Sequence, residues 1–183
     1  MLDLFSGLGG ASAAMKARGW DVVTVDVEPR FHCTFTADLL TWEPPADLGV
    51  LDLVWASPPC QEFSRHGMPW LRAKNPPPPS LDLLHAALRI IGRCDPDWWV
   101  VENVRGASAW FKPLLGEPRM YGAAFLWGRF PDLVAVEVPP HKERLSSTRR
   151  AERSMVPYPI SLALAKACES ASRHLFSTTE GKT

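Results

Sequence analysis

One cysteine stands in the most informative segment of this chain, residues 57–64, which read Ser-Pro-Pro-Cys-Gln-Glu-Phe-Ser. The segment follows an apolar run, residues 50–56, that predicts a buried strand. Two prolines in succession neither continue a strand nor begin a helix at once, so Cys60 is expected in a rigid turn at the strand's end. A thiol at that edge of an α/β sheet is a candidate nucleophile, although a small buried side chain is the commoner role of cysteine.

The amino terminus carries a second pattern with chemical meaning. Residues 2–5 predict a short strand, residues 6–10 a glycine-rich turn and residues 11–18 a helix. This order is the βα unit of nucleotide-binding folds, in which glycines allow close backbone approach and the helix start offers free N–H groups. The next predicted strand, residues 21–25, leads to Asp26, and a carboxylate there commonly binds ribose hydroxyls. The spacing fits neither the dinucleotide pattern nor a P-loop, and an ordinary solvated turn would look similar.

Three motifs follow one another along the chain. They are Asp-Leu-Phe-Ser-Gly-Leu-Gly-Gly at residues 3–10, Pro-Pro-Cys-Gln at 58–61 and Glu-Asn-Val at 102–104. In this order they resemble the DNA cytosine-5 methyltransferase family, and the chain is similar to its small, phage-like members. The resemblance implies a Rossmann-like, S-adenosylmethionine-dependent α/β fold whose mainly parallel sheet has helices on both faces. It also implies S-adenosyl-L-methionine as cofactor, S-adenosyl-L-homocysteine as product, and no metal.

The resemblance further assigns residues to the cofactor. The methionine part is expected on the glycine turn, the ribose at Asp26 and the adenine at Asp38. The full set expected at the cofactor is Asp3, Phe5, Ser6, Gly7, Gly9, Gly10, Asp26, Asp38, Leu39 and Pro58.

Catalysis is expected from Cys60, Glu102 and Asn103. Carbon 5 of cytosine is too weak a nucleophile to take a methyl group from a sulfonium. A thiolate that adds to carbon 6 converts the ring to an enamine with electron density at carbon 5. In the family the cysteine attacks the base and the glutamate holds it, and a carboxyl group suits hydrogen bonding to ring nitrogen 3. No residue in the sequence identifies the base that removes the carbon 5 proton, and water could serve.

The elements that must position these residues alternate along the chain. Strands are predicted at residues 2–5, 21–25, 51–56 and 98–102, and helices at 11–18, 81–93 and 160–173, with Ser80 as a cap of the second helix. Such alternation predicts a mainly parallel sheet in a single catalytic domain, residues 1–175, followed by a flexible tail, residues 176–183. Residues 61–79, with four consecutive prolines, form a long loop beside Cys60. In the family the equivalent loop closes over DNA.

The C-terminal part departs from the family pattern. The Gln-x-Arg-x-Arg motif is missing, and Arg119, Arg129 or Arg144 could replace its arginine. Residues 156–161 stand where the Gly-Asn-Ala-Val segment of the last family motif is expected. Little of the chain is left after Asn103 for a target-recognition domain, so we expect weak sequence specificity, or a protein partner that supplies it.

Charge bears on the binding of DNA. The formal net charge is zero, which argues against strong nonspecific binding by the whole surface. Residues 141–153 are nevertheless basic and could contact phosphates, although a solvated basic loop would look the same. The DNA contacts expected are Gln61, Ser64, Arg65, Lys142, Arg144, Arg149 and Arg150.

Composition sets the remaining limits. No apolar run is long enough for a membrane span, and the acidic Asp3 argues against a signal peptide. The four cysteines lack metal-ligand spacing, which favours thiols in the cytoplasm of a bacterial or phage-infected cell; three of them, Cys33, Cys94 and Cys168, are expected in the core.

The function predicted is methyl transfer to carbon 5 of a flipped cytosine in DNA. An RNA cytosine-5 methyltransferase, or a non-catalytic subunit that keeps the cofactor fold, would also account for the motifs. An amino-methyltransferase is disfavoured because Cys60 stands where its Pro-Pro motif carries an aromatic residue.

Overall fold

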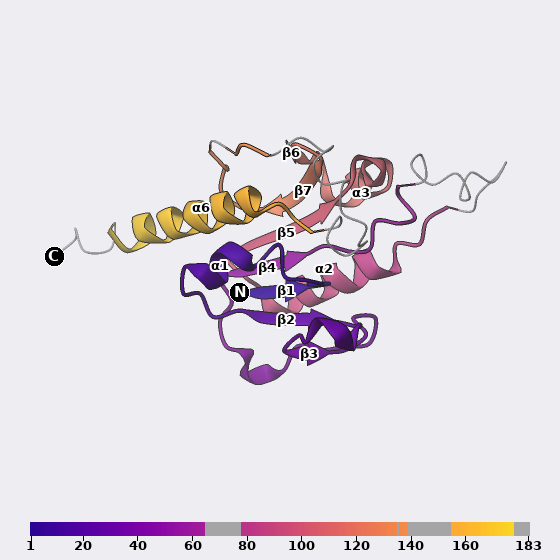
Figure 1. The fold of residues 1–183 in the computed structure, drawn as a ribbon, viewed down its shortest axis with the longest axis horizontal. Helices are drawn as coiled ribbons and strands as arrows, with labels where there is room; N and C mark the ends of the chain where they lie inside the picture. The colour runs from indigo at the N-terminus through magenta and orange to yellow at the C-terminus, as the bar shows by residue number, and fades with distance from the viewer. Residues whose placement is uncertain (65–77, 135, 139–154, 178–183) are drawn as a thin grey trace.

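A single seven-stranded sheet organises the computed structural model, which describes residues 1–64, 78–134, 136–138 and 155–177 (Figure 1). The strand order is β3-β2-β1-β4-β5-β7-β6. Strands β1 to β5 pair in parallel, whereas β7 runs antiparallel to both of its neighbours. The strands are β1 (Leu2–Leu4), β2 (Val23–Asp26), β3 (Phe35–Thr36), β4 (Leu53–Ala56), β5 (Trp98–Asn103), β6 (Arg119–Tyr121) and β7 (Ala124–Arg129).

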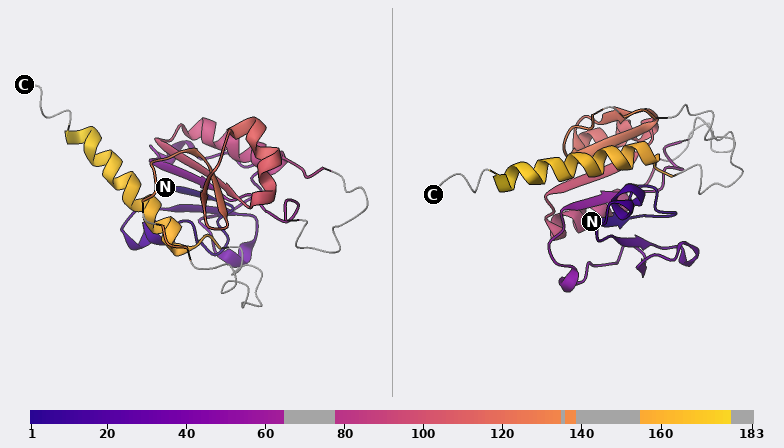
Figure 2. Two further views of the ribbon diagram at one scale, coloured as in Figure 1. Left: turned by 90° about the horizontal axis from the view of Figure 1, so that it is seen from above. Right: turned by 60° about the vertical axis from the view of Figure 1, so that its left-hand side comes forward.

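Helices cover both faces of the sheet (Figure 2). One face packs on α1 (Ala13–Ala17) and α6 (Tyr158–Ser177), and the other on α2 (Asp82–Cys94) and α3 (Ser108–Leu115). Successive side chains of a strand point to opposite faces of the pleated sheet. In β4, Trp55 packs toward α6 and Val54 packs toward α2. The predicted fold class, a mainly parallel α/β sheet with helices on both faces, is confirmed.

The predicted elements are present with shifted bounds. The first strand ends at Leu4 rather than Phe5, because Phe5 has left-handed backbone. The first helix is shorter than expected, the second agrees to within one residue at each end, and the last extends from 158 to 177. The predicted cap is displaced by one residue: Leu81 and not Ser80 is the N-cap of the second helix, although the Ser80 hydroxyl accepts a 3.1 Å hydrogen bond from the Asp82 N–H. No clear pattern in the sequence predicts β3, β6 or α3.

In the described part of the chain, no helix combines the length and the apolar character that crossing a membrane would require.

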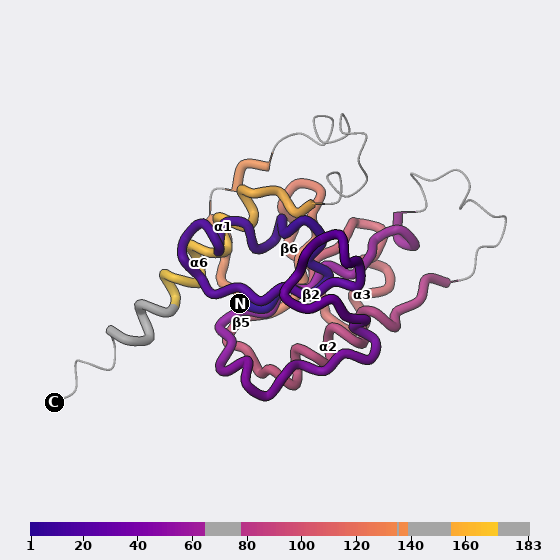
Figure 3. The backbone as a smooth tube through the Cα atoms, turned by 60° about the horizontal axis from the view of Figure 1, so that its bottom comes forward, coloured from indigo at the N-terminus to yellow at the C-terminus, as the bar shows by residue number. Residues whose placement is uncertain are grey.

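Hydrogen bonds hold α1 and α6 together although they are about 150 residues apart in the sequence, and Figure 3 shows the two helices side by side. Ser161 is fully buried; its hydroxyl donates to the Ala11 carbonyl at 2.6 Å and accepts from the Ala14 N–H at 3.0 Å. Near the surface, the Glu169 carboxylate accepts hydrogen bonds from Arg18 Nε (2.8 Å) and from the Trp20 indole N–H (3.1 Å).

Replacing Ser161 should therefore loosen this pairing. Ser161→Ala leaves a buried N–H and a buried carbonyl unsatisfied, and we expect a loss of about 1–3 kcal/mol in the free energy of unfolding. Urea denaturation followed by circular dichroism measures this loss. Ser170→Ala, at an exposed position of the same helix, is the matched control and should change stability by less than about 0.5 kcal/mol. Equal midpoints for the two variants would contradict the assignment.

Candidate active site

The turn after β1 is built from left-handed backbone. Phe5, Gly7 and Gly9 have φ angles of 58°, 51° and 77°. Glycine adopts this conformation freely, whereas Phe5 does so at a cost of about 1–2 kcal/mol. The Gly9 N–H closes the turn on the Ser6 carbonyl at 2.7 Å. A Cβ added at Gly7 would meet no heavy atom within 4 Å, so a ligand can approach the backbone closely here.

Asp26, the last residue of β2, is anchored to this turn. Its buried carboxylate accepts a hydrogen bond from the Gly7 N–H on one oxygen and from the Glu28 N–H on the other, each at 2.9 Å. Every carboxylate oxygen has a second lone pair. Asp26 can therefore hold the glycine turn in place and still accept hydrogen bonds from a ligand's hydroxyl groups.

Asp38 and Leu39 follow β3 at the same edge of the sheet. The exposed Asp38 accepts a 3.0 Å hydrogen bond from the Leu40 N–H on its carboxylate, and its backbone carbonyl accepts a 2.8 Å bond from the Trp42 N–H. Leu39 is buried in the same hydrophobic core as Leu4. The structure thus presents the Asp38 carboxylate to solvent, while Leu39 supports the site from beneath.

Asp3 lies under the glycine turn and is only 1% exposed. Ser12 Oγ donates to its Oδ2 at 2.6 Å, and Oδ1 has no hydrogen-bond partner among the described residues. Burial raises the pKa of Asp3 to about 7, against the opposing effects of the Ser12 hydrogen bond and the Lys16 ammonium. Asp3 is placed to support the turn from inside.

Gly10 joins the turn to the C-terminal segment. A Cβ at this position would lie 2.8 Å from the Val156 carbonyl oxygen and 2.9 Å from its nitrogen, closer than real Cβ atoms approach. Gly10 is therefore required by packing. Residues 156–161, which stand in place of the last family motif, begin directly against the turn expected to bind the cofactor.

The cysteines predicted for the core divide into two groups. Cys168 is buried, whereas Cys33 and Cys94 are half-buried. Cys33 Sγ lies 3.2 Å from Ser6 Oγ, so this thiol borders the glycine turn and the prediction that it is a core residue was wrong.

The nucleophile turn begins where β4 ends, at Ala56, as the two prolines require. The Cys60 carbonyl accepts hydrogen bonds from the Phe63 N–H (3.1 Å), the Ser64 N–H (2.9 Å) and the Ser64 hydroxyl (2.9 Å). These hydrogen bonds hold residues 60–64 in one tight turn. Cys60 is half-buried, and Gln61 beside it is exposed. The Ser64 hydroxyl, predicted to contact DNA, is engaged in holding the turn.

Asn103 connects this turn to the end of β5. Its Nδ2 donates to the Pro58 carbonyl at 2.9 Å, and its Oδ1 accepts from the Val104 N–H at 2.9 Å. Asn103 is 1% exposed and the Pro58 side chain is buried. Since β4 and β5 are parallel neighbours, this bond brings Cys60 and the half-buried Glu102 to adjacent strand ends.

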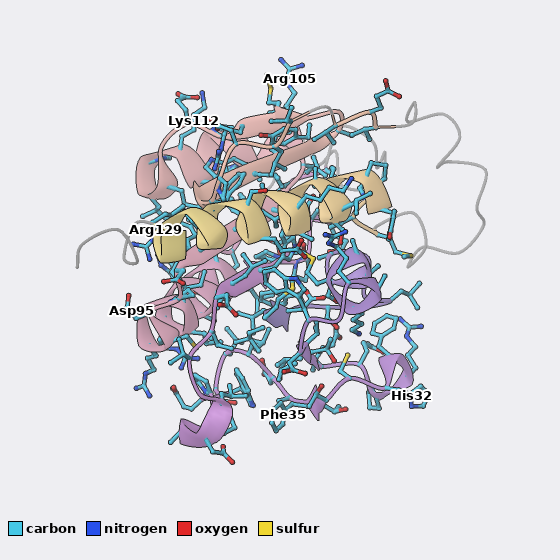
Figure 4. All side chains as sticks on the ribbon, turned by 90° about the vertical axis from the view of Figure 1, so that its left-hand side faces the viewer. His32, Phe35, Asp95, Arg105, Lys112 and Arg129 are labelled. Carbon is cyan, nitrogen blue, oxygen red and sulfur yellow. The ribbon has the colours of Figure 1, made fainter. Side chains whose placement is uncertain are left out.

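Neither of the two described arginines proposed as substitutes for the missing family arginine lies free at this site. The Arg119 guanidinium stacks on Phe130, bonds to Asp132 at 2.9 Å and donates to the Phe130 carbonyl. Arg129 pairs with Trp99 at the start of β5 and donates to the Pro96 carbonyl. Figure 4 shows Arg129 near Asp95, well away from Arg105. Because β7 is antiparallel to β5, Arg129 lies at the amino-terminal end of β5, away from the carboxyl ends of the parallel strands.

Several predicted residues lie outside the described part of the chain. These are Arg65, Lys142, Arg144, Arg149 and Arg150.

Two hollows, of about 400 and 290 Å³, lie at the amino-terminal edge of the strands. The larger is lined by residues such as Pro45 and Cys94, the smaller by Met1 and Asp52. Neither hollow includes a residue of the glycine turn or the nucleophile turn. We therefore place the site at the opposite, carboxyl ends of the strands, because the residues there have the chemistry that the reaction needs. Within the described ranges, no cluster of His, Cys, Asp or Glu could hold a metal ion.

The residues at the glycine turn and at the end of β2 fit S-adenosyl-L-methionine. Open space over Gly7 admits a ligand to the turn, and Asp26 keeps acceptor capacity where a ribose would lie.

Comparison with known proteins now decides the family. Residues 1–110, more than half of the 183-residue chain, match the model of the family described as C-5 cytosine-specific DNA methylase. The chain belongs to this family. A frog virus 3 (isolate Goorha) protein named "Probable DNA (cytosine-5)-methyltransferase" is 37% identical over 115 residues, which cover 56% of this chain and 52% of the relative.

One further relative and one solved structure are also similar to this chain. The type II methyltransferase M.AplI of Arthrospira platensis is 34% identical over 113 residues, covering 58% of this chain and 31% of the relative. A solved structure of a Spodoptera frugiperda DNMT2 mutant is 28% identical with a TM-score of 0.37, covering 59% of this chain and 36% of that one. The chain spans about half or less of the length of these relatives.

Sequence reasoning missed three residues that shape this site. The Phe63 ring packs edge to face on Phe111, with ring centroids 5.2 Å apart, and a Cβ at Gly106 would lie 2.1 Å from the Phe63 carbonyl oxygen. Gly106 stands just after the Glu-Asn-Val motif, which was the only available signal.

Asp3 gives the protein a specific pH dependence. The pKa of Asp3 is near 3.8 in the unfolded chain and about 7 in the folded protein, so the folded protein binds this proton more tightly. The contribution of Asp3 to the free energy of unfolding therefore falls as the pH rises from about 4 to 7, and it is constant above pH 7. In Asp3→Asn the amide oxygen still accepts from Ser12 and no charge is buried. The Tm of the variant relative to wild type should therefore rise across this range and then level off.

Thermal melts followed by circular dichroism at pH 4 to 8 measure this difference. Ser170→Ala, at an exposed position without an ionisable side chain, is the control and should show a gap that does not vary with pH. The same constant gap for Asp3→Asn would show that Asp3 does not titrate as described.

Proposed function

We propose that this chain transfers a methyl group from S-adenosyl-L-methionine to carbon 5 of a cytosine in DNA. The 2.9 Å hydrogen bond from Asn103 to the Pro58 carbonyl carries the proposal, because it holds the Cys60 turn beside the strand end that bears Glu102. A nucleophile and a group able to hold the base then stand on adjacent strands, as covalent catalysis on a pyrimidine requires. Membership of the C-5 cytosine-specific family supports the same reaction.

In the proposed reaction, the Cys60 thiolate donates an electron pair to carbon 6 of cytosine, and a C–S bond forms. The electrons of the ring's 5,6 double bond move toward carbon 5, while Glu102 hydrogen-bonds ring nitrogen 3 and limits the charge on the ring. Bound S-adenosyl-L-methionine supplies an electrophilic methyl group at carbon 5. Water then takes the carbon 5 proton, the double bond re-forms, and the thiolate leaves.

The cofactor would be held by the first half of the sheet. We assign the methionine part to the backbone of residues 6–10, the ribose hydroxyls to Asp26 and the adenine to the exposed Asp38. Asp3, Gly10 and Leu39 contribute by supporting these groups from beneath.

The target base must leave the duplex, because Cys60 cannot reach a stacked base; extrusion costs a few kcal/mol. Gln61 is exposed next to Cys60, and Arg105 is exposed on the turn after β5, where Figure 4 shows it pointing outward. We propose that both contact DNA, together with the basic residues predicted outside the described ranges. Because phosphate contacts carry no base information, a protein partner would supply sequence specificity. The cysteines, none of which forms a disulfide, support action in a reducing cytoplasm.

The engagement of Arg119 and Arg129 away from the site favours a second candidate, a cofactor-binding subunit that is inactive alone. Incubation with labelled cofactor and either DNA or RNA, followed by mass spectrometry of nucleosides, separates the candidates. We expect 5-methylcytosine in DNA. Label in RNA alone would transfer the activity to RNA, and no label with intact cofactor binding would favour the inactive subunit.

Cys60→Ser tests the nucleophile. With S-adenosyl-L-methionine present, DNA with 5-fluorocytosine should form a stable covalent adduct with wild type, because after methyl transfer the fluorine at carbon 5 cannot leave as a proton does. A hydroxyl is far less nucleophilic than a thiolate near neutral pH, so the variant should form none. Denaturing gel electrophoresis reads the adduct, and Cys94→Ser, half-buried beside the hollow away from the site, is the matched control that should still form it. An adduct with Cys60→Ser would place the attacking residue elsewhere.

Asp26→Ala tests the cofactor site. Loss of charge-assisted hydrogen bonds should weaken binding of S-adenosyl-L-homocysteine by about 1.5–3 kcal/mol, roughly 10- to 150-fold in Kd. Isothermal titration calorimetry measures the change, with Asp47→Ala as a control of unchanged affinity. Wild-type affinity in Asp26→Ala would remove this carboxylate from the site.

A further inference from the structure

The turn after β5 presses directly on the nucleophile turn. Gly106 lies in the short helical turn Arg105–Ala107, and a Cβ there would stand 2.1 Å from the Phe63 carbonyl oxygen. Because real Cβ atoms essentially never come within 3.0 Å of such an atom, an alanine would force the two backbone segments apart by roughly 1 Å. Gly106 is not among the residues with positive φ, so the glycine is required for space and not for backbone conformation.

Phe63 is held firmly on its other side. Its ring is 8% exposed and packs edge to face on Phe111, at 5.2 Å and 77°. Phe111 is fully buried and in turn contacts the Trp127 ring at 5.1 Å. Phe63 therefore cannot retreat from position 106 without breaking aromatic packing in a core that tolerates little change of volume.

A shift of Phe63 passes to Cys60, since the Phe63 N–H donates to the Cys60 carbonyl within the same tight turn. Gly106 itself lies four residues after Glu102. We propose that Gly106 is a positioning residue: its missing side chain lets the two turns seat against each other and so sets the distance between the Cys60 thiol and the Glu102 carboxyl. The inference rests on the proposed function, in which both groups act on one base.

Gly106→Ala tests the inference. A misplacement of roughly 1 Å in a reacting group can cost on the order of 100-fold in rate. We expect the rate of adduct formation with 5-fluorocytosine DNA to fall at least 10-fold and kcat to fall with it, while KM for DNA and Kd for S-adenosyl-L-homocysteine stay within about twofold. Gly92→Ala is the matched control, since a Cβ at Gly92 meets no atom within 4 Å. An unchanged adduct rate in a folded Gly106→Ala protein overturns the proposal.

Phe111→Leu gives an independent arm, in case Gly106→Ala fails to fold. It keeps an apolar side chain but loses the edge-to-face contact that holds Phe63, so the adduct rate should again fall without a matching loss of cofactor affinity. Trp110→Ala, on the same helix with its ring 38% exposed, is the control. Equal adduct rates in Phe111→Leu and Trp110→Ala would contradict the proposal.

Alkylation separates this inference from the proposed function. Iodoacetamide labelling, resolved by peptide mass spectrometry, gives the reactivity of Cys60 relative to Cys33 in the same molecule. We expect the ratio in Gly106→Ala to change at least threefold from wild type. If wild type forms no adduct with DNA, the proposed function fails, and the ratio alone decides whether Gly106 positions Cys60. An unchanged ratio then overturns the inference.

Discussion

The hydrogen bond between Asn103 and Pro58 is the interaction on which the arrangement of the site depends. Pro58 and Pro59 have no N–H to offer a neighbouring strand, so the ladder between β4 and β5 stops before them. The Pro58 carbonyl still needs a donor, because Pro58 is buried. Asn103, 45 residues further along the chain, supplies that donor from a fully enclosed position. A bond of this kind is costly to lose, which fixes the two strand ends relative to each other.

The direction of each strand then decides what reaches that edge. Parallel strands β1, β2, β4 and β5 all end there, so one side of the sheet collects the glycine turn, Asp26, Cys60 and Glu102. Strand β7 runs the other way and ends with Arg129 at the far edge, where the guanidinium meets the Pro96 carbonyl. An arginine that could replace the missing family arginine on sequence grounds is thereby removed from the site by a single antiparallel pairing.

Local patterns made the strands, the glycine turn and the nucleophile turn predictable. Apolar runs closed by glycine or proline specify both where a strand stops and which residue stands after it, as at Asp26 and Cys60. The contacts between turns were not predictable, because they depend on residues distant in sequence. Gly106 and Gly10 are ordinary turn glycines in the sequence, and only the tertiary structure shows that Phe63 and Val156 leave no room for a side chain. Short elements such as β3, with two residues, carry too little periodicity to be recognised.

The contact between Gly10 and Val156 also bears on the order in which the protein is made. The glycine turn leaves the ribosome well before the segment that packs against it and before the Ser161 hydroxyl, which satisfies the Ala11 carbonyl and the Ala14 N–H from about 150 residues further along the chain. Contacts so far apart in sequence form late because closing a long loop costs entropy. A nascent chain therefore carries an open first βα unit until α6 has been synthesised and can pack against it.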